Sequence, residues 1–286
     1  MEEILKYFPI NIVELIKKEI NKSKEILEKA IEIRIRINRP IIIRLINEDI
    51  IINYKIIEKD IINIIEKICE NSIYAYKNQI VEGYITIKGG NRVGLTGRAV
   101  IENEKIINIK YISGLNFRIA REVMGCGNNI LKEIVNVEEN TIYNTLILSP
   151  PGKGKTTILR DCIRQISNGI PSINFKGKNC SIIDERGEIA ANYKGIPKND
   201  IGIRTDVIEN ISKSKGIEML IRSMGPEIIA CDEIGTIEDV KAIKYALTSG
   251  VKGIFTMHGN KIEDARKNEE INKLIENKLI EKIIVL

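Results

Sequence analysis

One glycine-rich stretch near the middle of the chain constrains the fold more than any other feature. It consists of Ser149, Pro150, Pro151, Gly152, Lys153, Gly154, Lys155, Thr156 and Thr157. The apolar residues 141–148 before it predict a buried strand, and residues 157–167 after it repeat apolar side chains at helical spacing. A strand, a glycine-rich loop ending in Gly-Lys-Thr and a helix are together typical of a phosphate-binding loop. The sequence therefore predicts a nucleotide site, although such loops usually open with glycine where this chain has Ser149.

The residue types of this loop predict how it would hold a nucleotide. Backbone N–H groups of residues 152–156 can surround a phosphate, and the N-terminus of the following helix adds a partial positive charge. We expect Lys155 to reach the β- and γ-phosphates and the Thr156 hydroxyl to hold Mg²⁺. The predicted cofactors are therefore ATP and Mg²⁺, with every residue of the stretch a candidate nucleotide contact.

Strand and helix patterns alternate after the loop. Apolar runs that end in acidic or polar residues predict strands over 180–185, 228–233 and 253–258, and helical periodicity covers 212–224 and 236–249. Such alternation predicts an α/β fold with a mostly parallel sheet covered on both faces. We expect residues 127–286 to form a RecA-like P-loop ATPase domain.

The first part of the chain has a different pattern, which predicts a smaller α+β domain over residues 1–126. Helical periodicity alternates there with short β-type runs and Gly or Pro turns. The predicted helices cover 11–29, 58–70 and 72–81, and the predicted strands include 32–37 and 41–45. No linker rich in Pro, Gly and Ser separates the domains, so we place the boundary at the glycine-containing segment 124–128.

Two predicted strands end in Asp-Glu, and the sequence favours one of them as the catalytic pair. Asp232 and Glu233 precede the strand expected to lie beside the phosphate loop. We therefore expect Asp232 to hold Mg²⁺ and Glu233 to polarise the attacking water as a general base. For Asp184 and Glu185 two alternatives stay open: they orient Mg²⁺ or water from a distance, or they begin a polar loop.

Three further residues complete the candidate catalytic set. His258 is the only histidine in the chain, and together with Thr256 it ends the strand where a γ-phosphate sensor is expected. Arg186 and Arg204 are expected, with Arg222, near the carboxyl edge of the sheet, where an arginine can stabilise negative charge on the γ-phosphate. We predict that Arg204, or second Arg186, reaches the nucleotide of a neighbouring subunit in a ring; local pairing with Asp184, Glu185 or Asp206 is the alternative.

The composition excludes few classes of protein. The net charge is +5 with 29% charged residues and no dense basic block, so binding to nucleic acid is permitted but not indicated. The five cysteines lack C-x-x-C spacing, which predicts free thiols in a reducing compartment and no metal site. No apolar run approaches the roughly 18 residues that cross a bilayer. We expect a cytoplasmic protein that meets a membrane only through partners.

Longer strings of residues resemble one family. They are S-P-P-G-K-G-K-T-T-I-L-R-D, I-I-D-E-R-G-E-I-A, G-I-P-K-N-D-I-G-I-R-T-D-V, M-L-I-R-S-M-G-P-E-I-I-A-C-D-E-I-G and T-M-H-G, with E-I-R-I-R-I-N-R-P and F-R-I-A-R-E upstream. This succession resembles the stage III sporulation protein AA family, which is similar to the hexameric ATPases of type II and type IV secretion. By that resemblance, Asp184 and Glu185 correspond to the acidic box of the secretion ATPases and His258 to their histidine box.

The resemblance also implies a biological role. It implies an oligomeric motor in the mother cell of an endospore former, acting on the channel apparatus that faces the forespore. Its partners would be further copies in a hexameric ring and small membrane proteins of that apparatus.

Other classes of function share parts of the same pattern. A RecA-like translocase driven by nucleic acid has the same loop, but aromatic residues are only 5% and Trp is absent, so base-stacking modules are not indicated. A small-molecule kinase conflicts with the water-activating Glu233, and a scaffold without hydrolysis conflicts with the full set of catalytic residue types.

Overall fold

The computed structural model describes residues 1–22, 26, 29–119 and 123–286, and within it the chain forms two compact units, Met1–Arg121 and Glu122–Leu286. The segment just after this division contacts the second unit. Gly127 N–H donates to Asp161 Oδ2 at 2.8 Å, and Cys126 Sγ lies 3.6 Å from Thr157 O. Residues 123–126, which the sequence analysis placed in the N-terminal domain, therefore belong by their contacts to the second unit.

The first unit is the smaller α+β unit. Its elements are α1 Glu2–Leu5, α2 Ile10–Lys22, β1 Ala30–Arg36, β2 Ile41–Leu45, β3 Asp49–Ile52, α4 Glu58–Ile68, the 3-10 turn η1 Ile73–Tyr76, α5 Lys77–Val81, β4 Tyr84–Thr86, β5 Arg92–Glu102 and β6 Lys105–Arg118.

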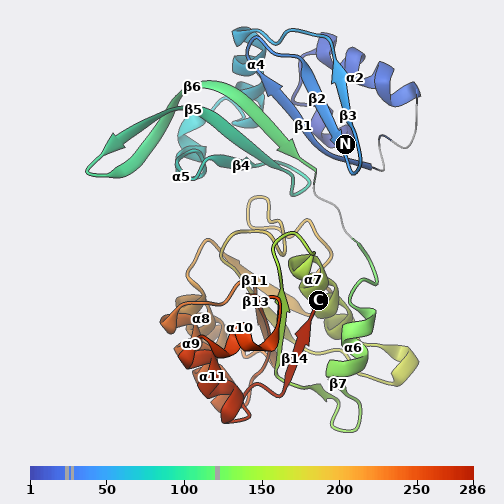
Figure 1. Ribbon diagram of the computed structural model, residues 1–286, viewed down its shortest axis with the longest axis vertical. Coiled ribbons are helices and arrows are strands. Elements are labelled where there is room, and N and C mark those ends of the chain that lie inside the picture. The colour runs from blue at the N-terminus through green and yellow to red at the C-terminus, as the bar shows by residue number, and fades with distance from the viewer. Residues whose placement is uncertain (23–25, 27–28, 120–122) are drawn as a thin grey trace. The chain divides into compact units, whose positions relative to one another are not determined.

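Its described strands form a six-stranded antiparallel sheet in the order β3-β2-β1-β6-β5-β4. The helices cover one face of this sheet (Figure 1). Isoleucines from both layers make a single core. Phe8 and Phe117 pack in that core with ring centroids 4.7 Å apart. The predicted helix over 11–29 is seen as α2, and residues 23–25 and 27–28 of that prediction lie outside the described residues. The hairpin of β5 and β6 extends well beyond the sheet as an arm (Figure 1).

The second unit carries the phosphate loop. Its elements are α6 Asn128–Ile134, β7 Val135–Asn136, β8 Thr141–Ile142, β9 Thr145–Ser149, α7 Lys155–Asn168, the 3-10 turn η2 Pro171–Ile173, β10 Cys180–Asp184, β11 Thr205–Glu209, α8 Lys213–Met224, β12 Ile228–Cys231, α9 Ile237–Thr248, β13 Lys252–His258, α10 Ile262–Arg266, α11 Glu269–Glu276 and β14 Lys282–Val285.

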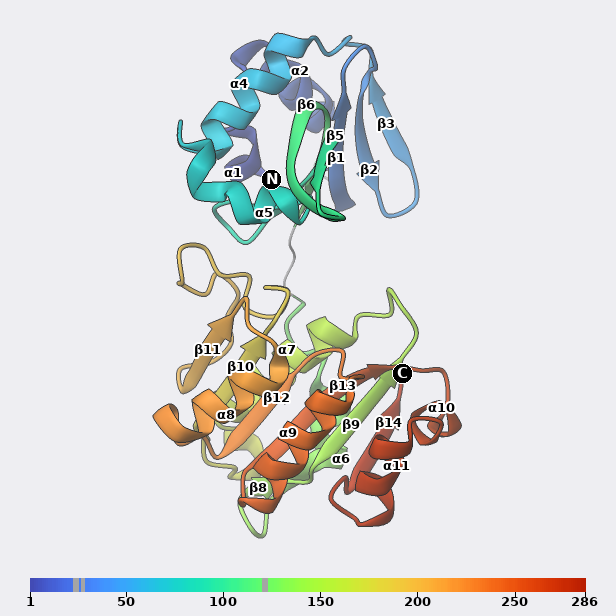
Figure 2. The ribbon, with the colours of Figure 1, turned by 90° about the vertical axis from the view of Figure 1, so that its left-hand side faces the viewer.

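Its main sheet has the order β11-β10-β12-β13-β9-β14, with every adjacent pair of described strands parallel. One apolar cluster joins α6 and α7 to one face, and another joins α8, α9 and α11 to the opposite face (Figure 2). This three-layer arrangement confirms the predicted parallel sheet covered on both faces. β11 was not predicted from the sequence pattern, because the strand is short and three of its five residues, Thr-Asp-Val-Ile-Glu, are polar.

The order of the central strands brings the candidate residues to one edge. β13 lies between β12 and β9, as expected for the strand beside the phosphate loop. Because the strands are parallel, the acidic ends of β10 and β12, the end of β13 and the loop after β9 share the carboxyl edge of the sheet. In the described ranges, no helix combines the length and apolar character that a membrane span requires.

Candidate active site

The phosphate loop connects β9 directly to α7. Gly152 and Gly154 have φ values of 77° and 85°, and Gly154 is the N-cap residue of α7. Space is open at both Cβ positions, so these positions require glycine because of their left-handed backbone and not because of a steric contact. Ser149, the departure from the usual pattern, is fully buried, and its hydroxyl donates to Pro150 O at 3.0 Å. Its small side chain therefore fits within the loop.

Lys155 opens α7 and points to the other candidate residues. It is only 6% exposed. Its Nζ lies 3.2 Å from Glu233 Oε1 and 3.3 Å from His258 Nδ1. Lys155 Nζ also lies 3.5 Å from His258 Nε2, and that nitrogen lies 3.0 Å from Glu233 Oε1. The structure thus brings Lys155, Glu233 and His258 together.

Asp232 contacts the phosphate loop from the end of β12. The Thr156 hydroxyl donates to Asp232 Oδ2, and the Thr256 hydroxyl donates to Oδ1. Mg²⁺ is commonly bound through one or two carboxylates together with substrate phosphates and water, so the adjacent oxygens of Thr156 and Asp232 fit it. In the part of the chain that the structure describes, no group of three or more His, Cys, Asp or Glu side chains forms a preassembled metal cluster.

Thr256 differs from its predicted position as a phosphate sensor. It is fully buried, and besides its contact with Asp232 it accepts the Glu233 N–H at 2.9 Å. Its carbonyl also accepts Ile234 N–H at 2.8 Å. Thr256 therefore orders the Asp-Glu pair from the neighbouring strand. Of the two polar residues that end β13, only His258 is partly exposed at the edge of the sheet.

Glu233 has an unusual backbone and a strongly positive environment. Its φ of 53° lies in the left-handed region, which costs a non-glycine residue about 1–3 kcal/mol and persists only where the surroundings impose it. Burial raises the pKa of its carboxyl, but the hydrogen bond from Lys155 and the charges of Arg186 and Lys155, with His258, lower the pKa below its usual range. Glu233 is therefore held as a carboxylate at neutral pH.

Arg186 reaches the same carboxylate from the loop after β10. Its Nη1 pairs with Glu233 Oε2, while Lys155 and His258 lie at Oε1. Both carboxylate oxygens are thus engaged by groups from three different segments. Arg186 contacts a residue of its own chain, which places it at the candidate site without a neighbouring subunit.

The other acidic pair divides into two different roles. Asp184 is 2% exposed, and its carboxylate accepts three backbone N–H groups, from Glu188 at 2.8 Å, Ile189 at 3.0 Å and Ala190 at 2.9 Å. These contacts support the alternative in which Asp184 begins and closes a polar loop. Glu185 instead pairs with Lys213.

Lys213 is a residue that the sequence analysis missed. It is the first residue of α8 and lines one pocket with Glu185, Arg186, Asp232 and Glu233. A lysine in the first turn of a helix opposes the helix dipole, which favours acidic side chains there. A lysine at this unfavourable position in the sequence is the signal that could have identified Lys213.

Arg204 and Arg222 are not where the sequence analysis placed them. Arg204 directly precedes β11, and Arg222 lies in the last turn of α8, so both are at the amino edge of the sheet. The prediction of the carboxyl edge was wrong for both residues: Arg204 precedes β11, a strand that was not anticipated, and Arg222 ends the helix that leads into the start of β12. Arg204 Nη1 instead donates to Ser167 O at 2.9 Å. A contact of Arg204 with the nucleotide of a neighbouring subunit stays a prediction.

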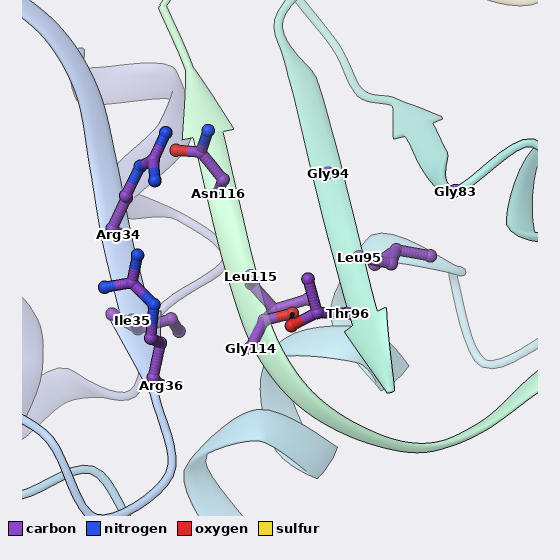
Figure 3. A pocket seen from close by; sticks show the side chains of 10 residues that line it. All are labelled: Arg34, Ile35, Arg36, Gly83, Gly94, Leu95, Thr96, Gly114, Leu115 and Asn116. Atoms are coloured by element: carbon purple, nitrogen blue, oxygen red, sulfur yellow. Dashed lines mark hydrogen bonds between the residues drawn. The ribbon is translucent and has the colours of Figure 1, made fainter. Parts of the chain in front are cut away.

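A separate pocket lies on the sheet of the first unit. It has a volume of about 290 Å³ and is lined by residues of β1, β5 and β6 (Figure 3). Arg34, Arg36, Thr96 and Asn116 line it together with Gly94 and Gly114 (Figure 3). Arg34 Nε is paired with Glu32 at 2.6 Å. None of the candidate catalytic residues lines this pocket.

The chain is similar to known proteins in its sequence and in its fold. The family model for sporulation stage III, protein AA matches residues 2–286. The chain is 38% identical over 255 residues to stage III sporulation protein AA of Bacillus subtilis (strain 168), which covers 89% of this chain and 81% of the relative.

Two solved structures are similar at the level of the fold. The Legionella pneumophila ATPase DotB aligns with a TM-score of 0.61 at 17% identity, covering 96% of this chain and 74% of DotB. The pilus retraction motor PilT with bound ADP aligns with a TM-score of 0.61 at 17% identity, covering 92% and 76%. The fold is therefore that of the RecA-like secretion ATPases, and the chain belongs to the stage III sporulation protein AA family.

Proposed function

We propose that this protein is a Mg²⁺-dependent ATPase that acts as an oligomeric motor of the secretion type. The observation that carries the proposal is the contact between Thr156 of the phosphate loop and Asp232 of β12, with Lys155 and Glu233 beside them. This constellation joins a phosphate cradle, a set of oxygen ligands and a carboxylate base at one sheet edge. The fold that the chain shares with the ATPase DotB and the pilus retraction motor PilT supports the proposal.

Each of these side chains has a separate role in the proposed phosphoryl transfer. The loop and Lys155 bind the β- and γ-phosphates, and Thr156 and Asp232 provide oxygens for Mg²⁺. The metal would neutralise charge on the phosphates. Glu233 accepts a proton from the attacking water, which its carboxylate form allows. We infer that His258 contacts the γ-phosphate; its distance of 3.0 Å from Glu233 and its partial exposure support this role.

The biological role is proposed from the family. Membership in the stage III sporulation protein AA family supports action in endospore formation. We infer a hexameric ring on the mother cell side of the forespore, which works on the channel apparatus through its membrane proteins. ATP would then be hydrolysed to move or assemble that apparatus.

Phosphate release and nucleotide affinity test the enzymatic part. Lys155→Ala should weaken ATP binding and hydrolysis together, because it removes the charge on the phosphates. Glu233→Gln should bind ATP normally but hydrolyse it about 10²–10⁴-fold more slowly, because a general base typically accelerates a reaction by that factor. Asp232→Asn should raise the Mg²⁺ concentration needed for activity.

Asp206→Asn is the matched control, because this exposed aspartate lies on β11 of the same sheet. Wild-type protein without ATP hydrolysis at any Mg²⁺ concentration, or full activity of Glu233→Gln, would contradict the assignment. Sizing the protein with and without ATP and Mg²⁺ tests the ring.

A further inference from the structure

The short loop after β10, residues 185–190, is fixed on both sides; we call it the acidic loop. Asp184 holds its second half through three backbone N–H groups. Arg160 of α7 donates from Nε to Ile189 O at 2.6 Å and from Nη2 to Glu188 O at 2.8 Å. Asn199 adds a bond to Ile189 O at 2.8 Å. The acidic loop is therefore attached to the helix that begins at the phosphate loop.

An ion pair between the buried Lys213 and the partly exposed Glu185 fixes the first half of the acidic loop. Lys213 is 7% exposed and pairs with Glu185. Burying an ammonium group carries a desolvation cost that only a close partner offsets, and the position of Lys213 in the first turn of α8 is unfavourable for a cation. The carboxylate of Glu185 offsets this desolvation cost by pairing with the Lys213 ammonium. The pair thus connects α8 to the residue directly before Arg186.

Arg186 extends from this anchored backbone to Glu233. Its side chain is 63% exposed, whereas that of Glu233 is 19% exposed. The exposed arginine would sample many rotamers if its backbone were free. Because both flanks of the acidic loop are fixed, the Arg186 guanidinium lies against Glu233 Oε2. Lys155 lies 3.2 Å and His258 3.0 Å from the other oxygen, Oε1.

We propose that Arg186 is a positioning residue that orients Glu233 within its own subunit, and that Lys213 acts through Glu185 to aim Arg186. The proposal rests on the proposed ATPase function. When Lys155 binds phosphate oxygens, it leaves the carboxylate of Glu233, and Arg186 and His258 remain as its partners. Arg186 then prevents rotation of the base away from the attacking water. Misplacing a catalytic group by about 1 Å can cost about 10²-fold in rate.

Steady-state kinetics test the role of Arg186. Arg186→Ala should lower kcat by about 10–100-fold, with KM and the affinity for a fluorescent ATP analogue changed less than about twofold, since phosphate binding does not depend on Arg186. Arg186→Lys should recover part of kcat, because a cation remains within reach of Glu233. Arg222→Ala, an exposed arginine at the amino edge, is the matched control and should match wild type. Equal losses in kcat and affinity, or an unchanged kcat, would overturn the proposal.

A double-mutant cycle tests the role of Lys213. Lys213→Met should lower kcat in the same direction, whereas Lys215→Met, exposed on the same helix, should not. Groups that act through one another give non-additive effects. Lys213→Met should therefore cause no further loss in the Arg186→Ala background. Additive losses would mean that Lys213 does not act through Arg186.

Subunit mixing separates action within a subunit from action across an interface. Arg186→Ala is mixed with Glu233→Gln, and joint assembly is verified with affinity tags. An arginine that served a neighbouring subunit would restore activity at interfaces that combine intact Glu233 with intact Arg186. We expect no recovery; recovery would refute action in cis. If the protein is monomeric, the loss in Arg186→Ala is itself a cis effect.

These outcomes are distinct from failure of the proposed function. Wild-type protein that does not hydrolyse ATP would refute the ATPase assignment. Active wild type together with a fully active Arg186→Ala would refute only the positioning role.

Discussion

The substitution Asp184→Asn distinguishes a structural carboxylate from a catalytic one. Asp184 is 2% exposed and accepts N–H groups from three residues at 2.8–3.0 Å. Hydrogen bonds to a charged group contribute about 1.5–3 kcal/mol each, and neutral ones about 1 kcal/mol. Asparagine has one accepting oxygen, so at least one N–H loses its partner and the others bond to a neutral group. Three bonds to the carboxylate at about 1.5 kcal/mol each are replaced by two neutral bonds at about 1 kcal/mol each. The expected loss of unfolding free energy is therefore about 2–3 kcal/mol.

Thermal unfolding measures this loss directly. For a unit the size of Glu122–Leu286, such a change lowers Tm by about 5–10 °C. Asp206→Asn, exposed on the adjacent strand, should change the unfolding free energy by less than about 0.5 kcal/mol. Turnover at 25 °C is measured in parallel. An unchanged Tm with turnover lost as completely as in Glu233→Gln would refute this reasoning and make Asp184 part of the chemistry.

Three other substitutions follow from contacts around α7. Burial raises the pKa of Asp161, but the hydrogen bonds to its carboxylate outweigh burial and lower the pKa. The stability that these bonds contribute is therefore present above the unfolded pKa near 3.8 and is lost as pH falls through the folded pKa. Urea unfolding should show Asp161→Asn less stable than wild type at pH 7, and the difference in stability should shrink below about pH 4. Gly127→Ala should lower Tm, because its Cβ would lie 2.8 Å from Cys162 Sγ; an unchanged Tm would mean that the segment before α6 moves freely. Gly154→Ala should weaken ATP binding and cost about 1–2 kcal/mol of stability, since its φ is 85°; equilibrium binding and unfolding of one sample would check both.

Local sequence patterns determined much of the fold. The strand, glycine-rich loop and helix around Lys155 are a local signal, and the structure has β9, the loop and α7 there. The first residues of the predicted strand 141–148 instead form the separate strand β8. The alternation of strands and helices was sufficient for a parallel sheet, because parallel neighbours need crossover connections. Spacing along the chain also identified β13 as the strand beside the phosphate loop.

Only the tertiary structure decided which residues meet. Two identical Asp-Glu pairs end strands, yet Asp184 accepts backbone N–H groups while Asp232 contacts Thr156, because β12 and not β10 adjoins β13. Arg204 lies at the amino edge because it precedes a strand that local pattern did not reveal. Lys213 meets Glu185 across 28 residues of sequence. Periodicity records which face of an element is buried, whereas the partner of a charged side chain depends on strand order and direction, which are non-local properties of the chain.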